Sequence, residues 1–151
     1  MRAVIQRVSE ASVTIDGKEK AAINKGLLVL IGIEEADSQT DIEWLSGKIV
    51  RLRVFSDENQ LMNLSIQNMK GEILVISQFT LFADTKKGNR PSYIRAARPE
   101  IAIPIYNRFL EQLTKDLAAK VYSGEFGADM KVKLINDGPV TLFIDTKNKN
   151  A

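Results

Sequence analysis

Three stretches of the sequence carry groups that could take part in chemistry, and the first reads S-Q-F-T-L, residues 77–81. It follows an apolar run and puts Ser77, Gln78 and Thr80 where apolar side chains would continue a buried strand. Buried polar groups need hydrogen-bond partners or they cost free energy. Because side chains alternate along a strand, Gln78 and Thr80 would share one face and could serve a site together. The pattern alone slightly favours the simpler interpretation, in which the strand leaves the core here.

The second stretch is a cationic loop that follows directly. Residues 84–91 read D-T-K-K-G-N-R-P, with Lys86, Lys87 and Arg90 around the flexible Gly88. Lysine and arginine neutralise phosphate charges, and a glycine lets the main chain come close to a ligand. The alternative is a solvated basic loop. Sites often form where loops leave a rigid sheet, so the position of this loop next to residues 77–81 favours phosphate binding.

The third stretch, residues 136–141, reads N-D-G-P-V-T and interrupts good strand sequence with Gly138 and Pro139. Sheets tolerate these two residues least, because proline has no N–H and glycine weakens a strand. A tight turn or bulge would explain the pair, and the pattern alone favours it. A functional interpretation begins with the X-Pro bond, which can adopt the cis form at modest cost. Carbonyl oxygens that make no ladder bonds could then accept from a ligand amine.

The composition excludes most catalytic arrangements, because the chain has no cysteine and no histidine. Disulfides, thiolate nucleophiles, Ser-His-Asp triads and zinc sites built on these residues are therefore excluded. The remaining tools are hydroxyls, carboxylates, lysines, backbone groups and functional groups of the substrate. We predict no cofactor and no metal.

Length and charge fit one ordinary globular domain covering residues 1–151, with 44% hydrophobic and 26% charged residues and a net charge of +2. The opening residues 1–8 lack the apolar region of a signal peptide. The longest apolar run, residues 27–33, is far shorter than the roughly 20 residues of a membrane helix. We therefore expect a cytoplasmic protein without membrane association.

Hydrophobic spacing predicts the elements that must position these stretches. Asp16-Gly17 is a favoured hairpin turn, and Thr40 with Glu43 forms a plausible capping box. The expected strands are residues 1–7, 12–15, 18–23, 26–33, 54–55, 72–82, 130–135 and 140–144, and the expected helices are residues 40–52 and a second one from Pro99 or Pro104 to about residue 120. Hairpin-like succession favours an α+β fold, with a mainly antiparallel sheet or partial barrel and two helices.

In combination these stretches are more specific than each is alone. The opening M-R-A-V-I-Q-R-V, the run S-Q-F-T-L-F-A-D-T-K-K-G-N-R-P and the later N-D-G-P-V-T closely resemble the D-aminoacyl-tRNA deacylase (D-tyrosyl-tRNA deacylase) family over essentially the whole chain. The resemblance implies a DTD-like fold and a homodimer with its active site at the subunit interface. It also implies hydrolysis of the ester that joins a D-amino acid to tRNA, a proofreading step that rejects L-aminoacyl-tRNA. Glycyl-tRNA, including glycine mischarged on tRNA-Ala, is a further implied substrate.

The same resemblance implies roles for individual residues. Gly138-Pro139 is the Gly-cisPro motif, which reaches into the other subunit's pocket, holds the substrate α-amino group and excludes an L side chain. Arg7 braces this loop. The segment Ser77, Gln78, Phe79 and Thr80 lines the pocket around the ester and the adenosine. Lys86, Lys87 and Arg90 meet tRNA phosphates.

Members of the family have been described both with Thr80 as nucleophile and with the ribose 2′-OH assisting instead. Without histidine or cysteine, Thr80 lacks an obvious base, because a carboxylate would need a strongly raised pKa. We therefore favour substrate-assisted hydrolysis, with backbone N–H groups near Gln78 and Phe79 as oxyanion donors. Two alternatives stay open, a non-catalytic RNA-binding module and a protein acting on free D-amino acid derivatives. The latter leaves the basic loop without a purpose.

Overall fold

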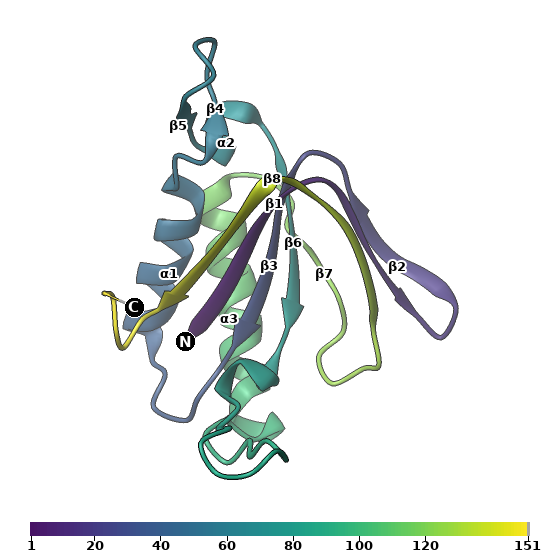
Figure 1. Cartoon of the computed structure of the whole chain (residues 1–151), viewed down its shortest axis with the longest axis vertical. Coiled ribbons are helices and arrows are strands. Elements are labelled where there is room, and N and C mark those ends of the chain that lie inside the picture. Colours follow the sequence, from purple (N-terminus) through teal and green to yellow (C-terminus); the bar gives the residue numbers. More distant parts are fainter. Residues whose placement is uncertain (151) are drawn as a thin grey trace.

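The computed structural model describes residues 1–150 (Figure 1). The elements are β1 (Arg2–Ile15), β2 (Lys18–Ile23), β3 (Gly26–Gly32), α1 (Gln39–Arg51), β4 (Phe55–Ser56), β5 (Met62–Leu64), α2 (Ile66–Met69), β6 (Glu72–Ser77), the 3-10 helix η1 (Phe79–Phe82), α3 (Pro99–Leu117), β7 (Tyr122–Ser123) and β8 (Lys131–Asp145). Both long helices were predicted, whereas the single turns α2 and η1 were not.

The main sheet has the strand order β2-β1-β3-β6-β7. Strand β3 pairs with the first half of β1 and β2 with the second half, while β8 pairs along nearly the whole length of β1. Strands β3, β6 and β7 pair in parallel, and the other pairs of this sheet are antiparallel. The sheet curls toward a barrel, and α1 and α3 lie side by side on one face (Figure 1). This α+β arrangement confirms the predicted fold class. The two strands predicted at residues 1–7 and 12–15 are one long strand, as are the two predicted after residue 130.

Strand β3 is buried on both faces, as its unbroken apolar sequence predicted. Leu27, Val29 and Ile31 face the helices and join the larger core, which α1 and α3 cover. Leu28 faces the other way and packs in a smaller core with Leu74 and further residues of β1 and β2. The central strands are therefore fixed from both sides, which gives the loops at their ends a rigid support.

Helix α1 begins with Ser38 as N-cap, and the capping box predicted at Thr40 and Glu43 is wrong. The carboxylate of Asp41 accepts from the Ser38 N–H at 2.9 Å. Helix α3 begins at Pro99 rather than Pro104, and it ends at Leu117, where Ala118 adopts a left-handed conformation. No helix among residues 1–150 combines the length and apolarity needed to cross a membrane.

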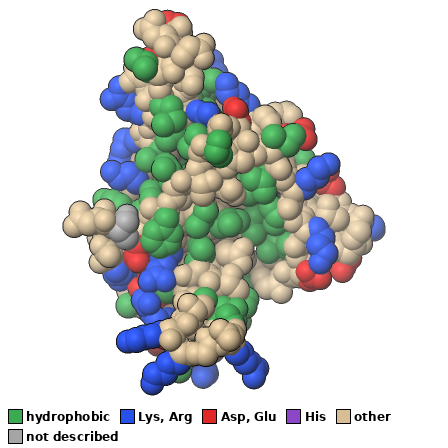
Figure 2. All heavy atoms as spheres, viewed as in Figure 1, with side chains coloured by type: hydrophobic (Ala, Val, Ile, Leu, Met, Phe, Trp, Pro, Cys, Tyr) green, Lys and Arg blue, Asp and Glu red, His purple; other side chains and the backbone are tan. Residues whose placement is uncertain are grey.

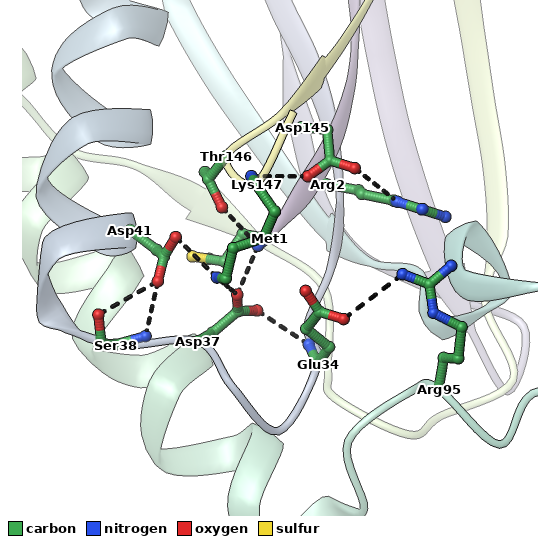
Figure 3. A network of polar contacts seen from close by, with 10 residues as sticks. All are labelled: Met1, Arg2, Glu34, Asp37, Ser38, Asp41, Arg95, Asp145, Thr146 and Lys147. Carbon is green, nitrogen blue, oxygen red and sulfur yellow. Dashed lines mark hydrogen bonds and ion pairs between the residues drawn. The ribbon is translucent and has the colours of Figure 1, made fainter. Parts of the chain in front are cut away.

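A polar network fastens the two ends of the chain to the loop before α1 (Figure 3). The Met1 amino group contacts Asp37 and donates to the Thr146 hydroxyl at 2.8 Å. The ammonium group of Lys147 lies 2.8 Å from carboxylate oxygens of both Asp37 and Asp41. Arg2 pairs with Asp145 on the neighbouring strand at 3.0 Å. The network therefore holds the start of β1 and the end of β8 next to the loop after β3.

Candidate active site

Strand β6 ends at Ser77, and the chain then turns instead of continuing as a strand to Phe82 as predicted. The N–H of Gln78 still donates to the Ile31 carbonyl at 2.7 Å, after which η1 begins. The side chain of Phe82 is 1% exposed, so its burial favours the turn over an extended exit. The prediction that Gln78 and Thr80 lie on one face of a strand is therefore wrong. The turn nevertheless joins them, because the Gln78 amide donates to the Thr80 hydroxyl.

Two features hold η1 against the sheet. A Cβ at Gly32 would lie 3.0 Å from the Leu81 Cβ and 3.1 Å from the Gln78 carbonyl oxygen, so glycine permits this close approach. The Arg2 guanidinium donates to the Leu81 carbonyl at 2.9 Å through Nη1 and to Asp145 at 3.0 Å through Nε. Arg2 was not among the predicted site residues. The sequence could not indicate this contact, because Arg2 and Leu81 are 79 positions apart in the chain.

The N–H groups of Phe79 and Thr80 are free for a ligand. The first N–H groups of a helix have no partner within it. Among residues 1–150, those of Phe79 and Thr80 have no backbone acceptor, whereas the Gln78 N–H is used by Ile31. Of the two predicted oxyanion donors, the geometry therefore favours Phe79 over Gln78 and adds Thr80.

A hollow of about 240 Å³ opens beside this turn. Its walls are Ser77, Gln78 and Phe79 on one side and the segment Phe126–Met130 on another, with Ile31, Ile33, Ala97 and Ala102 completing the lining. The Phe79 ring is 55% exposed, which is unusual for so large an apolar side chain and leaves it available to a ligand. The structure thus brings three of the four predicted catalytic residues to one hollow, with Thr80 bonded to Gln78 beside it.

The wall formed by Phe126 was missed by sequence reasoning, because its loop carries only a turn pattern, G-E-F-G. The Phe126 ring packs edge-on against Tyr106 with centroids 5.6 Å apart. Burial raises the pKa of Tyr106 to about 12 against a weaker opposing hydrogen bond, so the phenol stays neutral. Its hydroxyl donates to the Val75 carbonyl at 3.4 Å. A rigid apolar support therefore backs this wall.

Asp129 carries the carboxylate among the residues that line the hollow. Its side chain is 87% exposed and lies 3.2 Å from the ammonium group of Lys131. A general base must reach the proton that it removes. A solvated, ion-paired carboxylate is poorly suited to activate Thr80, which agrees with the sequence argument against a threonine nucleophile.

The Gly138-Pro139 bond lies within β8 and is cis. Strand β8 shifts its register against β1 at this point, between the pairs Gln6–Thr141 and Val8–Asn136. Gly138 and Pro139 are exposed. A Cβ at Gly138 would lie 2.6 Å from the Val140 nitrogen, so even alanine would force the loop to move.

Arg7 contacts this loop as predicted. Its Nε donates to the Asp137 carbonyl at 2.8 Å, and its Nη1 donates to the Val54 carbonyl at 2.7 Å. One guanidinium therefore ties the residue before Gly138 to the chain that enters β4. Arginine suits this position because its fork offers several donors in fixed directions.

Asn136 is a second brace of the same loop, and sequence reasoning missed it. Its carbonyl oxygen accepts from the Val140 N–H at 2.8 Å, while its amide nitrogen donates to the Val140 carbonyl at 3.2 Å and to the Thr141 hydroxyl at 3.0 Å. The Asn side chain thus replaces the ladder bonds that the Gly-Pro pair cannot make. The signal was present, since asparagine commonly closes turns through its side chain.

Within one chain the Gly-Pro loop and the hollow lie at opposite ends of the sheet. Gly138 is level with Arg7 on β1, whereas Ser77 is level with Ile31 and Ala3. Four positions along a strand and three strand spacings across the sheet are about 13 Å and about 14 Å, or roughly 20 Å together. Figure 1 shows the middle of β8 at the upper end and the end of β6 at the lower end. A single chain therefore does not bring Gly138-Pro139 together with residues 77–80.

The basic loop does lie next to the hollow. Asp84 and Ser92 exchange two backbone hydrogen bonds of 2.7 Å and 2.9 Å, which closes the loop directly after η1. Lys86, Lys87 and Arg90 are exposed on it. Figure 2 shows lysine and arginine side chains gathered at this lower end of the molecule. The predicted phosphate-contacting residues are thus free to meet a ligand that leaves the hollow.

Known proteins identify the family. The sequence model of the family described as D-Tyr-tRNA(Tyr) deacylase matches residues 4–145. The chain belongs to the D-Tyr-tRNA(Tyr) deacylase family. Two relatives are D-aminoacyl-tRNA deacylases, from Bacteroides fragilis with 66% identity and from Flavobacterium psychrophilum with 65%, each over 99% of both chains.

Solved structures agree with the fold of the deacylase family. A chain described as c-Myc DNA Unwinding Element Binding Protein is 44% identical and has a TM-score of 0.90, covering 96% of this chain and 98% of its own. A probable eukaryotic D-amino acid tRNA deacylase shares the fold at 17% identity, with a TM-score of 0.80 over 95% and 97% of the two chains. Family membership confirms the predicted hydrolase acting on D-aminoacyl-tRNA. The roles of individual residues stay predictions.

Proposed function

We propose that the ester of D-aminoacyl-tRNA is cleaved at a site that two copies of this chain build together. The observation that carries the proposal is the distance of roughly 20 Å over the sheet between Gly138 and Ser77 in one chain, estimated from strand geometry. Within one chain, Gly138-Pro139 and residues 77–80 are therefore too far apart to contact the same aminoacyl group. In a symmetric dimer, the exposed Gly-Pro loop of each copy would close the hollow of the other.

The sheet offers an apolar face for such a dimer. Val4 is the cross-strand partner of both Leu30 and Phe143, and these side chains lie on the face away from the helices. Phe143 is 44% exposed. Figure 2 shows hydrophobic side chains gathered over this part of the surface. An apolar patch of this kind is typical of an interaction surface between protein molecules.

In the proposed reaction, water attacks the ester carbonyl and the bond to the ribose 3′ oxygen breaks. The proton that water gives up goes to that oxygen, so the products are the D-amino acid and tRNA with a free 3′-OH. The N–H groups of Phe79 and Thr80 stabilise the oxyanion that forms at the carbonyl. The ribose 2′-OH positions the water, because Asp129, the carboxylate that lines the hollow, is solvated and paired with Lys131.

The Gly-Pro loop selects D-aminoacyl over L-aminoacyl substrates. Its backbone carbonyls accept from the substrate α-amino group, and the rigid backbone leaves no room for a side chain of L configuration. Glycine has no side chain on either side of its α-carbon, so glycyl-tRNA fits the same gate, including glycine mischarged on tRNA-Ala. Because tRNA is charged and used in the cytoplasm, the reaction is proposed to take place there.

The experiment that tests this proposal follows release of labelled tyrosine from D-tyrosyl-tRNA and L-tyrosyl-tRNA by the purified protein, with its mass in solution measured alongside. We expect a dimer that hydrolyses only the D ester. Binding of tRNA without cleavage of either ester would favour a non-catalytic RNA-binding module. Equally fast cleavage of D-tyrosine ethyl ester would favour a protein acting on free D-amino acid derivatives.

A further inference from the structure

A second hollow, of about 580 Å³, lies beside the first one, and the turn at residues 93–97 separates the two. Ala97 lines both, so the two hollows are neighbours. The second one, here called the Tyr93 hollow, is also lined by Tyr93, Ile94, Arg98 and two carboxylates. Its volume is in the range of small-molecule sites, which is about 300–1,000 Å³.

The wall between the hollows is a fixed turn. The Ala97 N–H donates to the Ile33 carbonyl at 2.9 Å, and the Ala96 N–H closes the turn on the Tyr93 carbonyl at 3.0 Å. The Tyr93 ring meets the Phe79 ring edge-on, with centroids 5.0 Å apart. A ligand that leaves the first hollow past Phe79 therefore reaches Tyr93 next.

The turn exposes apolar groups that do not serve the core. Ile94 is 88% exposed and Tyr93 is 38% exposed. Exposed aromatic and aliphatic side chains beside cationic ones are typical of single-stranded nucleic acid sites, where bases stack on the apolar groups and phosphates meet the cations. Arg98 is exposed at the edge of the hollow and makes no ion pair among residues 1–150. The basic loop precedes the turn directly.

We infer that the Tyr93 hollow binds the nucleotide that precedes the terminal adenosine of the tRNA. This inference rests on the proposed function, in which the first hollow takes that adenosine and its ester. The preceding nucleotide is cytidine in the CCA end of tRNA. Its 4-amino group is a donor, which the carboxylates of Glu35 and Glu100 in the hollow can accept. Uridine has a carbonyl at that position and would meet the same carboxylates unfavourably.

The test uses three short substrates, D-tyrosyl-adenosine, D-tyrosyl-cytidylyl-adenosine and D-tyrosyl-uridylyl-adenosine. We expect kcat/KM to rise about tenfold from the first to the second, as stacking of one base allows, and to rise less for the third. Ile94→Ser should remove most of the rise, and the Glu35→Gln, Glu100→Gln double variant should remove the preference for cytidine. Leu61→Ser, which replaces an equally apolar and 63% exposed side chain far from the hollow, is the matched control.

The outcomes separate the inference from the proposed function. Hydrolysis of D-tyrosyl-adenosine with no gain from the added cytidine overturns the inference and leaves the proposed function standing. Failure to cleave any of the three substrates or D-tyrosyl-tRNA overturns both. A gain that Ile94→Ser leaves intact means that the nucleotide binds elsewhere. Loss of the dimer in Ile94→Ser, measured by sedimentation, means that a second copy covers this hollow, and this too overturns the inference.

Discussion

Arg2 and Leu81 are joined across the sheet by a 2.9 Å hydrogen bond from the guanidinium to the carbonyl oxygen. The same guanidinium pairs with Asp145 at 3.0 Å and lies 4.6 Å from the centre of the Phe82 ring. The turn that carries Phe79 and Thr80 is therefore fastened to the opening strand rather than only to its own neighbours. The guanidinium therefore pairs with Asp145 and also positions the turn whose N–H groups are the proposed oxyanion donors.

We expect Arg2→Lys to separate these two effects. Lysine keeps a charge for Asp145 but cannot also reach the Leu81 carbonyl with a second donor in fixed geometry. Stability in urea should fall by no more than about 1 kcal/mol, whereas kcat on D-tyrosyl-tRNA should fall about tenfold because a loosened oxyanion site misplaces its donors. Arg53→Lys, at an exposed position, is the control. An unchanged kcat in Arg2→Lys would remove the positioning role.

Gly138→Ala tests the gate. The added Cβ would lie 2.6 Å from the Val140 nitrogen, so the loop must shift and its carbonyls must leave their positions. We expect kcat/KM for D-tyrosyl-tRNA to fall at least about a hundredfold, as displacement of a substrate-positioning group allows. Gly17→Ala is the matched control, because Gly17 also has a backbone conformation that disfavours alanine but has open space around it. Full activity of Gly138→Ala would contradict the gate.

The basic loop should act through charge alone. Lys86 and Lys87 are exposed and carry no ion pair among residues 1–150, so their replacement by alanine should not affect folding. Each phosphate contact contributes about 0.7 to 0.9 to the slope of log affinity against log salt. We expect the double variant to bind tRNA more weakly, with that slope reduced by about 1 to 2, and to keep its kcat. Lys18→Ala with Lys20→Ala removes the same charge from the β2 hairpin as a control. An unchanged salt slope would exclude phosphate contact by this loop.

The network at the chain ends predicts a pH dependence of stability. Burial alone would raise the pKa of Asp41, but hydrogen bonds from Lys147, Thr146 and the Ser38 backbone outweigh it and hold the pKa well below its usual range. A carboxylate with a lowered folded pKa adds stability above its unfolded pKa of about 4, and this stability is lost as the pH falls toward the folded value.

Asp41→Asn should therefore lower the free energy of unfolding by about 1–2 kcal/mol at about pH 7 and by less, roughly half as much, at about pH 2.5. Urea unfolding at several pH values measures both quantities. Glu43→Gln removes an exposed carboxylate from the same helix and should change little. A difference between wild type and Asp41→Asn that stays constant down to about pH 2.5 would contradict this linkage.

The sequence predicted those parts of the fold that follow from local pattern. Apolar spacing placed α1 within one residue at each end, and the unbroken apolar run of β3 predicted its burial on both faces. Prediction from the sequence failed where tertiary packing decides the local conformation. The pattern could not show that burial of Phe82 would bend the chain after Ser77, nor that Ser38 rather than Thr40 would cap α1.

The site was predicted in part for the same reason. Motif residues such as Gln78 and Gly138 were found through their recognisable stretches. Arg2 and Phe126 act through contacts with residues far away in the chain, which no local pattern encodes. Asn136 lay inside a recognised stretch, but its role depends on the register shift of β8 against β1, which appears only when the strands are paired.

Thr80→Ala decides between the two mechanisms. The Thr80 hydroxyl accepts from the Gln78 amide, and Asp129, the carboxylate that lines the hollow, is solvated and paired with Lys131. If the ribose 2′-OH assists, the variant keeps the backbone N–H of residue 80, and kcat should fall by no more than about tenfold, the effect of one lost hydrogen bond. A D-tyrosyl ester of 2′-deoxyadenosine-ended tRNA should then be cleaved at least about a hundredfold more slowly by the wild type. Loss of all activity in Thr80→Ala, with tRNA binding intact and the 2′-deoxy substrate still cleaved, would instead make the threonine hydroxyl the nucleophile.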